Sequence, residues 1–121
     1  MSASTLMLDQ MHRVCTQHSV PFEELDWEQN VGVSANLFLG QQPINGLRHH
    51  QEDGTLGWYL YASEDFPTED NAFRPVCAKH LFERELSYLK FLALPPGWRF
   101  LTDDKGYEDV WFDESLLEKH T

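Results

Sequence analysis

The sequence contains few cysteines and no long apolar segment. Its 121 residues include only Cys15 and Cys77, too few for a disulfide framework, which favours a reducing cytoplasm. No run approaches the roughly 20 apolar residues that a membrane-spanning helix needs. The first ten residues carry no lysine or arginine, and Asp9 interrupts their apolar run, which does not fit a signal peptide. We therefore expect a soluble, cytoplasmic protein.

Basic residues are scarce as well. Nine lysines and arginines stand against 20 aspartates and glutamates, which gives a formal net charge of -11. A negative field of this size repels nucleic acid and anionic membranes, so we expect direct binding to neither. The charge fits either a highly soluble surface or electrostatic steering of a basic protein partner.

The length and composition fit one folded domain over residues 1–121. A chain of this size buries roughly 65% of the surface that its unfolded form exposes, which is enough for a single core. The hydrophobic fraction of 41% and the aromatic fraction of 13% argue against disorder despite the acidic balance.

Apolar residues recur at helical spacing in two segments. Residues 5–18 form the first, and Ser4 before it suits a helix N-cap. Residues 75–93 form the second, which begins with Pro75, a residue type tolerated at the first helical position, and ends just before Pro95. The second segment predicts a long helix with a buried stripe comprising Ala78, Leu81, Phe82, Leu86, Leu89, Leu92 and Ala93.

Other regions have the alternation or the bulky composition of strands. Residues 31–40 alternate with a period of two, and residues 57–62 are bulky on both faces, which is typical of a central strand. Residues 98–102 and 107–112 flank a short loop with a glycine and predict a hairpin. The remaining expected elements are a turn at Pro43, Asn45 and Gly46, a return strand over 47–51, an exposed acidic loop over 63–74 and a short helix capped by Asp113. The class is therefore α+β, with a mostly antiparallel sheet packed against the long helix at 75–93 and the N-terminal helix.

Two cysteine–histidine pairs are candidate metal ligands. Cys15 and His18 lie one helical turn apart, as do Cys77 and His80, and together they could form a Cys2His2 zinc site. Cysteine is also a small side chain that is often buried, and this packing role is the interpretation we favour. The adjacent histidines at 49–50 point to opposite faces of a strand and cannot both grip one ion without distortion. We therefore expect no metal.

No catalytic motif stands out. Paired carboxylates are frequent, but pairs in polar loops are more often solvated than arranged around a cleft. Either cysteine can be combined with a distant histidine as nucleophile and base, yet no local signature supports such a pair. Glycine motifs for phosphate and twelve-residue calcium loops are absent from the sequence. We expect a binding protein without a cofactor; a small hydrolase using acidic or Cys–His residues, or a regulatory binding module, is the alternative.

Acidic side chains cluster in two loops next to aromatic strands. A charged rim around an aromatic centre is the usual anatomy of a protein interface. We favour a core position for Trp58, Trp98 and Trp111, because large aromatic side chains dominate the interior of small domains. The acidic side chains are therefore the candidate partner-binding residues, namely Glu64, Asp65, Glu69, Asp70, Asp103, Asp104, Glu108 and Asp109.

A set of aromatic and glycine motifs resembles a known family. In chain order they are Gly57-Trp58, then Ser63-Glu64-Asp65, an expected helix, Leu94-Pro95-Pro96-Gly97-Trp98-Arg99-Phe100 and Asp109-Val110-Trp111-Phe112-Asp113. The set is similar to that of the bacterial immunity protein 33 family, formerly a domain of unknown function. The resemblance covers about residues 31–118 and leaves the N-terminal helix, residues 1–20, outside.

The resemblance implies a function in bacterial competition. Proteins of that family are thought to bind and neutralise a cognate toxin in the producing cell or its sister cells, so it implies stoichiometric inhibition without a cofactor or turnover. An acidic surface then suits a basic toxin such as a nuclease. No catalytic residue is carried over, and the interface residues are not transferred by position, because immunity proteins differ in their specificity surfaces.

Overall fold

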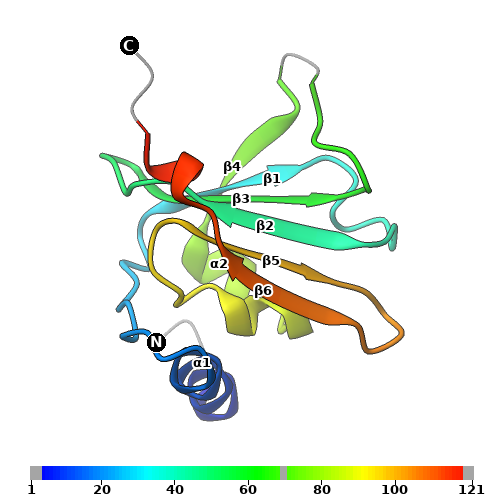
Figure 1. The fold of residues 1–121 in the computed structure, drawn as a ribbon. Coiled ribbons are helices and arrows are strands. Elements are labelled where there is room, and N and C mark those ends of the chain that lie inside the picture. The colour runs from blue at the N-terminus through cyan, green and yellow to red at the C-terminus, as the bar shows by residue number, and fades with distance from the viewer. Residues whose placement is uncertain (1–3, 69–70, 119–121) are drawn as a thin grey trace.

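The fold is built on one six-stranded sheet with the strand order β4-β1-β3-β2-β5-β6 (Figure 1). The computed structural model describes residues 4–68 and 71–118. Strands β1 and β3 are parallel, and the other neighbouring pairs are antiparallel. The strands are β1 (Asn30–Ser34), β2 (Ile44–Arg48), β3 (Thr55–Ala62), β4 (Phe73–Cys77), β5 (Trp98–Thr102) and β6 (Glu108–Phe112).

Helical segments cover one face of this sheet. They are α1 (Thr5–Gln17), α2 (Ala78–Phe82) and the 3-10 helix η1 (Ser87–Phe91), and a second 3-10 helix, η2 (Glu114–Leu117), follows β6. Figure 1 shows α1 and α2 on the same side of the strands. The main core lies between these layers and includes Met11, Val31, Trp58, Leu81 and Phe100, all fully buried. The α+β class and the N-terminal helix are confirmed, and the Ser4 hydroxyl caps α1 by accepting the Met7 N–H at 3.1 Å.

The predicted long helix over residues 75–93 is wrong. Pro75 lies inside β4, an edge strand, where a missing backbone N–H is best tolerated. The helix α2 that follows is only five residues long, and Glu85 then adopts a left-handed φ of 54° that ends helical geometry before η1. The spacing nevertheless identified buried side chains, because short helical turns also bring residues i and i+3 to one face. Of the predicted stripe, Leu86 is only half-buried, whereas Ala78, Leu81, Phe82, Leu89, Leu92 and Ala93 are buried.

Two other predicted boundaries are corrected. β1 ends at Ser34, and the chain turns over residues 35–40, so Leu39 is 72% exposed instead of facing the core. β2 begins at Ile44, so the expected turn residues Asn45 and Gly46 lie in a strand. Glycine is required at position 46 because a Cβ there would lie 2.1 Å from a ring carbon of Phe100. The central strand and the β5–β6 hairpin agree with the prediction.

Three consecutive carbonyl groups at Leu92–Leu94 bind donors from distant parts of the chain. Trp58 Nε1 donates to the first at 2.9 Å. The backbone N–H of Glu23 donates to the second at 3.0 Å, and Cys15 Sγ lies 3.6 Å from the same oxygen. Arg48 Nη1 donates to the third at 2.8 Å. These bonds attach the segment after η1 to both the sheet and the N-terminal region.

Arg48 is the most unusual of these donors because it is a buried charge. Its side chain is only 1% exposed, and its Nε also donates to the Leu56 carbonyl at 2.9 Å. Burial lowers the pKa of Arg48 to about 10, and the nearby negative charge of Glu23 opposes that effect. Arg48 makes no ion pair within the described residues, so backbone carbonyl groups and the Trp58 ring, 5.9 Å away, surround a guanidinium that is still charged at neutral pH.

Replacing Leu89 tests the covered face of the sheet. Leu89 is fully buried in η1, so Leu89→Ala removes apolar contacts and leaves a cavity. We expect a loss of about 2–5 kcal/mol in the free energy of unfolding, measured by urea denaturation. Leu39→Ala is the exposed control and should change stability by less than about 0.5 kcal/mol. A loss below about 1 kcal/mol for Leu89→Ala would show that this position is not part of the core.

Replacing Arg48 tests the attachment of Leu94 to the sheet. Arg48→Met keeps an unbranched side chain but removes the donors to the Leu56 and Leu94 carbonyl groups. We expect a loss of about 2–5 kcal/mol in the free energy of unfolding, because two buried acceptors lose their partner. Arg74→Met, at an exposed position of β4, is the control. Equal stability of both variants and the unmodified chain would contradict this role for Arg48.

Replacing Tyr88 tests a buried hydroxyl. The side chain is 8% exposed, its hydroxyl has no hydrogen-bond partner in the described structure, and burial raises its pKa to about 12. Since the folded pKa exceeds the unfolded one, ionisation of Tyr88 leaves the free energy of unfolding unchanged below pH 10 and lowers it as pH rises from 10 to 12. At pH 12 this loss is about 2 kcal/mol.

Denaturation with urea between pH 7 and pH 12 measures this effect. Tyr88→Phe should be as stable as the unmodified chain, or more stable, at pH 7, because it removes an unpaired buried hydroxyl. Between pH 10 and pH 12 its stability should decline less steeply than that of the unmodified chain. Arg48 and the other titrating groups are common to both proteins, so their contribution cancels. Parallel stability curves over that range would contradict the assignment.

Candidate functional site

The face of the sheet opposite the helices carries the candidate binding surface. Alternate residues along each strand point to opposite faces, so Tyr59 and Tyr61 of β3 point away from the core that holds Trp58. With Leu47 of β2 they form a second apolar cluster, to which Phe73 of β4 is adjacent. Within residues 4–68 and 71–118, the one buried residue that this cluster receives from outside the sheet is Leu116 of the short helix η2, so the face is partly open.

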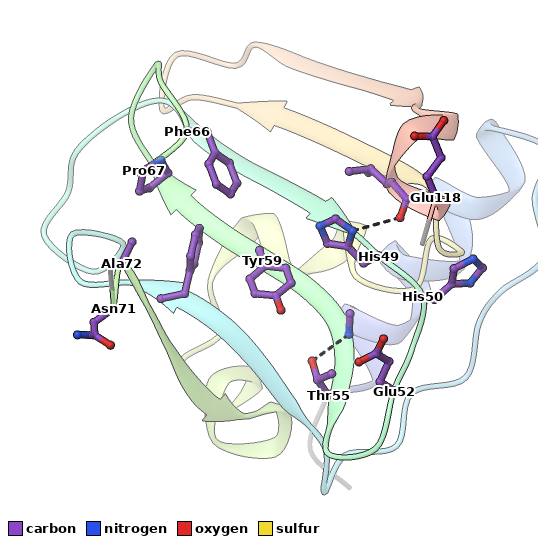
Figure 2. Close-up of a pocket in the computed structure, with 13 residues that line it drawn as sticks. His49, His50, Glu52, Thr55, Tyr59, Phe66, Pro67, Asn71, Ala72 and Glu118 are labelled. Atoms are coloured by element: carbon purple, nitrogen blue, oxygen red, sulfur yellow. Dashed lines mark hydrogen bonds between the residues drawn. The ribbon is translucent and has the colours of Figure 1, made fainter. Parts of the chain in front are cut away.

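A groove with a volume of about 910 Å3 lies on this open face (Figure 2). Tyr59 lies at its centre, Phe73 is also a lining residue, and Phe66 and Pro67 line one side. His49, Glu52 and Glu118 line the other side. The lining residues are His49, His50, Glu52, Thr55, Gly57, Tyr59, Phe66, Pro67, Asn71, Ala72, Phe73, Leu116 and Glu118.

Aromatic rings in and beside the groove support one another. The Tyr59 and Phe73 ring centroids are 5.2 Å apart in an edge-to-face arrangement, and Phe66 lies 5.6 Å from Phe73 and 5.4 Å from Tyr61. His49 contacts the other side of Tyr59 at 5.5 Å. Phe66 is nonetheless 49% exposed. Mutual packing fixes these rings before any partner arrives, so a partner would meet an ordered aromatic surface.

Hydrogen bonds hold the η2 side of the groove in place. The ring Nδ1 of His49 lies 3.1 Å from the Leu116 carbonyl oxygen. Asp113 caps η2 through the Ser115 N–H at 3.0 Å and forms an ion pair with Arg99 at 3.1 Å. The hydrogen bonds from the Ser115 hydroxyl and from Arg99 hold the pKa of Asp113 below its usual range. This side of the groove is therefore tied to the sheet at neutral pH.

Glycine is required where β3 passes β2 at the groove. Gly57 has a φ of +91°, which side chains rarely tolerate, and a Cβ there would lie 2.2 Å from the His49 carbonyl oxygen. The close approach lets the His49 N–H donate to the Gly57 carbonyl at 2.8 Å.

The two predicted acidic loops emerge from the same end of the sheet, on the right in Figure 1. β3 ends at Ala62 opposite Ile44, and Ile44 is also opposite Thr102, where β5 ends. Glu64 and Asp65 follow β3 and are exposed, whereas Glu69 and Asp70 lie outside the described residues.

In the second acidic loop, some of the carboxylates bind other groups of the chain and thereby stabilise the hairpin. Asp103 Oδ1 accepts the backbone N–H groups of Lys105 at 2.8 Å and Tyr107 at 3.0 Å, which shapes the β5–β6 turn. Glu108 forms an ion pair with Lys90 at 2.5 Å. Within this loop, Asp104 and Asp109 are exposed and have no such partners in the described structure.

The cysteine–histidine pairs have packing contacts. Cys15 is buried, and burial raises the pKa of its thiol, which makes it a poor nucleophile. Cys77 Sγ lies 3.3 Å from the Trp27 carbonyl oxygen, and the His18 ring lies 5.8 Å from Trp98. Within residues 4–68 and 71–118, no three His, Cys, Asp or Glu side chains gather as a metal site requires.

None of the described helices has the length and apolar character needed to cross a membrane.

The aromatic groove is not apparent from the sequence. The bulky residues around Tyr59 indicate a central strand, and no motif distinguishes Phe66 or Phe73. The available signal was the alternation within β3, where Tyr59 and Tyr61 occupy the face opposite Trp58. Of the three tryptophans expected in the core, Trp58 is fully buried, whereas Trp98 and Trp111 are half-buried.

Comparison with known proteins identifies the family. A family model described as the Imm33-like domain matches residues 10–113. No curated protein and no solved structure matches the chain. The family match confirms the resemblance seen in the sequence; it begins earlier, at residue 10 within α1, and ends at residue 113 instead of 118. Because the matched region contains all six strands and most of α1, the chain belongs to the Imm33-like domain family.

Proposed function

We propose that this protein is an immunity protein that binds a cognate bacterial toxin and neutralises it stoichiometrically. Membership of the Imm33-like family is the observation that carries the proposal. Binding would take place in the cytoplasm of the producing cell or its sister cells, without turnover and without a cofactor.

The open face of the sheet supports a binding role. Protein interfaces commonly have an apolar, aromatic centre that excludes water and a polar rim. Tyr59, Phe66 and Phe73 supply such a centre, and Glu52 and Glu118 lie at its margin. Since the helical layer covers the opposite face, the groove is the described surface where a partner can bury aromatic area with least rearrangement.

The charge distribution supports a basic toxin, such as a nuclease, as the partner. The net charge of -11 speeds the encounter with a basic protein. The topology brings Glu64 and Asp65 to the same end of the sheet as Asp104 and Asp109. We therefore retain as proposed partner-binding residues the acidic set Glu64, Asp65, Glu69, Asp70, Asp103, Asp104, Glu108 and Asp109, with Asp103 and Glu108 also serving the hairpin itself.

Co-purification from the native host, followed by mass spectrometry, identifies the toxin, and co-expression with that toxin tests protection.

A charge variant then tests the steering role of the first acidic loop. It combines Glu64→Gln, Asp65→Asn, Glu69→Gln and Asp70→Asn. We expect its association rate with the toxin to fall about tenfold at low salt and to depend less on ionic strength.

A control variant carries the same change in net charge elsewhere. It combines Asp9→Asn, Glu24→Gln, Glu83→Gln and Glu85→Gln, all at exposed positions. Its association rate should fall less than that of the loop variant, because its charges lie outside the proposed interface. Equal rates for the loop variant and the unmodified chain at every ionic strength would contradict the role of this loop.

A further inference from the structure

We propose that the groove on the open face is a receptor site for an arginine side chain carried by a protein partner. The proposal rests on the proposed function only for the partner's identity, since the chemistry of the groove stands by itself. Two properties of the groove, its aromatic centre and the charge of its margin, select this side chain.

The aromatic centre offers ring surfaces to a cation. Phe66 is half exposed, and Tyr59 and Phe73 are partly exposed beside it. A guanidinium over such a ring is attracted by the negative ring face and loses less hydration than an ammonium. The chain already makes this contact elsewhere, because the Arg84 guanidinium carbon lies 3.9 Å from the Phe38 ring centroid. The groove thus presents the same type of surface without an occupant from the described chain.

The margin of the groove adds negative charge. Glu52 and Glu118 are the acidic residues that line the groove, and no lysine or arginine of the described residues lines it. Arg74 does not line the groove; it lines the adjoining hollow, which Asp53 also lines. An acidic partner side chain would be repelled here, and an apolar one would leave both carboxylates without a counter-charge.

The Glu52 carboxylate belongs to a well-defined turn. The backbone N–H of Glu52 donates to the Thr55 carbonyl at 3.2 Å, and the Thr55 N–H donates back at 3.1 Å. The Thr55 hydroxyl is occupied, because it donates to the Asn30 carbonyl at 3.2 Å and accepts the Gly57 N–H at 3.1 Å. In Figure 2 the Tyr59 hydroxyl points along the groove toward this turn. A guanidinium stacked near Tyr59 would therefore find Glu52 as its carboxylate partner.

Arginine fits this arrangement better than lysine. Its flat guanidinium can lie against a ring while its edge donates two parallel hydrogen bonds to one carboxylate. Lysine brings a compact, strongly hydrated charge that cannot do both with the same atoms. The volume of about 910 Å3 lies within the range of about 300–1,000 Å3 of pockets that hold small ligands, so an arginine and its flanking backbone have room.

A peptide titration monitored by NMR tests the site on the full chain. The probe is an acetylated, amidated Gly-Arg-Gly-Arg-Gly peptide, and its partner probe replaces each arginine by citrulline, which keeps the shape and removes the charge. We expect the arginine peptide to shift the ring signals of Tyr59, Phe66 and Phe73 and to bind at least about tenfold more tightly than the citrulline peptide. Equal affinity of the two peptides, or shifts confined to residues outside the groove, would overturn the proposal.

Matched variants locate the binding. Phe66→Ala and Glu52→Gln change exposed side chains, and each should weaken the arginine peptide about fivefold or more. Leu39→Ala and Glu83→Gln, also exposed but outside the groove, should leave its affinity unchanged. If both groove variants bind the arginine peptide with unchanged affinity, the peptide is attracted by the net charge of the protein and does not bind in the groove, which contradicts the proposal.

The outcomes separate this inference from the proposed function. If the arginine peptide fails to bind in the groove while the protein still protects cells from its toxin, the arginine site is wrong and the immunity function stands. If the peptide binds as expected but the co-purified partner is not a toxin, the site stands and the immunity function is wrong.

Discussion

Arg48 and Trp58 determine how the helical layer sits on the sheet, because their side chains bind the Leu94 and Leu92 carbonyl groups. A chain that leaves a helix exposes carbonyl groups without helical partners, and burying them unpaired is costly. Here the residues after η1 are buried, so two strand side chains supply the missing donors. The buried charge of Arg48 is tolerated because its donors meet oriented backbone dipoles, although burial lowers its pKa to about 10.

This attachment leaves the two faces of the sheet with different tasks. The helical layer covers the face of Trp58 and Phe100, which forms the main core. On the opposite face the cluster around Tyr61 has few residues and reaches solvent through Tyr59, Phe66 and Phe73. The apolar surface that remains open is stabilised from within, by edge-to-face packing of its rings and by η2, which Asp113 and Arg99 fasten to the sheet. The main core and the open aromatic groove thus lie on opposite faces of one sheet.

The sequence predicted burial better than conformation. Periodic apolar residues identified the buried positions between 78 and 93, but Pro75 also suits an edge strand, and a left-handed residue such as Glu85 gives no periodic signal. Local turn chemistry predicted the β5–β6 hairpin and the Asp113 cap because both depend on neighbouring residues. The groove was not predictable in this way. His49, Tyr59 and Phe73 come from three separate segments, and only the strand order β1-β3-β2 with β4 at the edge brings them together.

Oxidative footprinting of the complex with the co-purified toxin tests whether a partner binds the open face of the sheet, because side-chain oxidation reports solvent access. We expect oxidation of Tyr59, Phe66 and Phe73 to fall on binding, while that of Leu6, which is 68% exposed on α1, stays the same. Protection of Leu6 with unchanged oxidation of the three groove rings would show that the partner binds elsewhere.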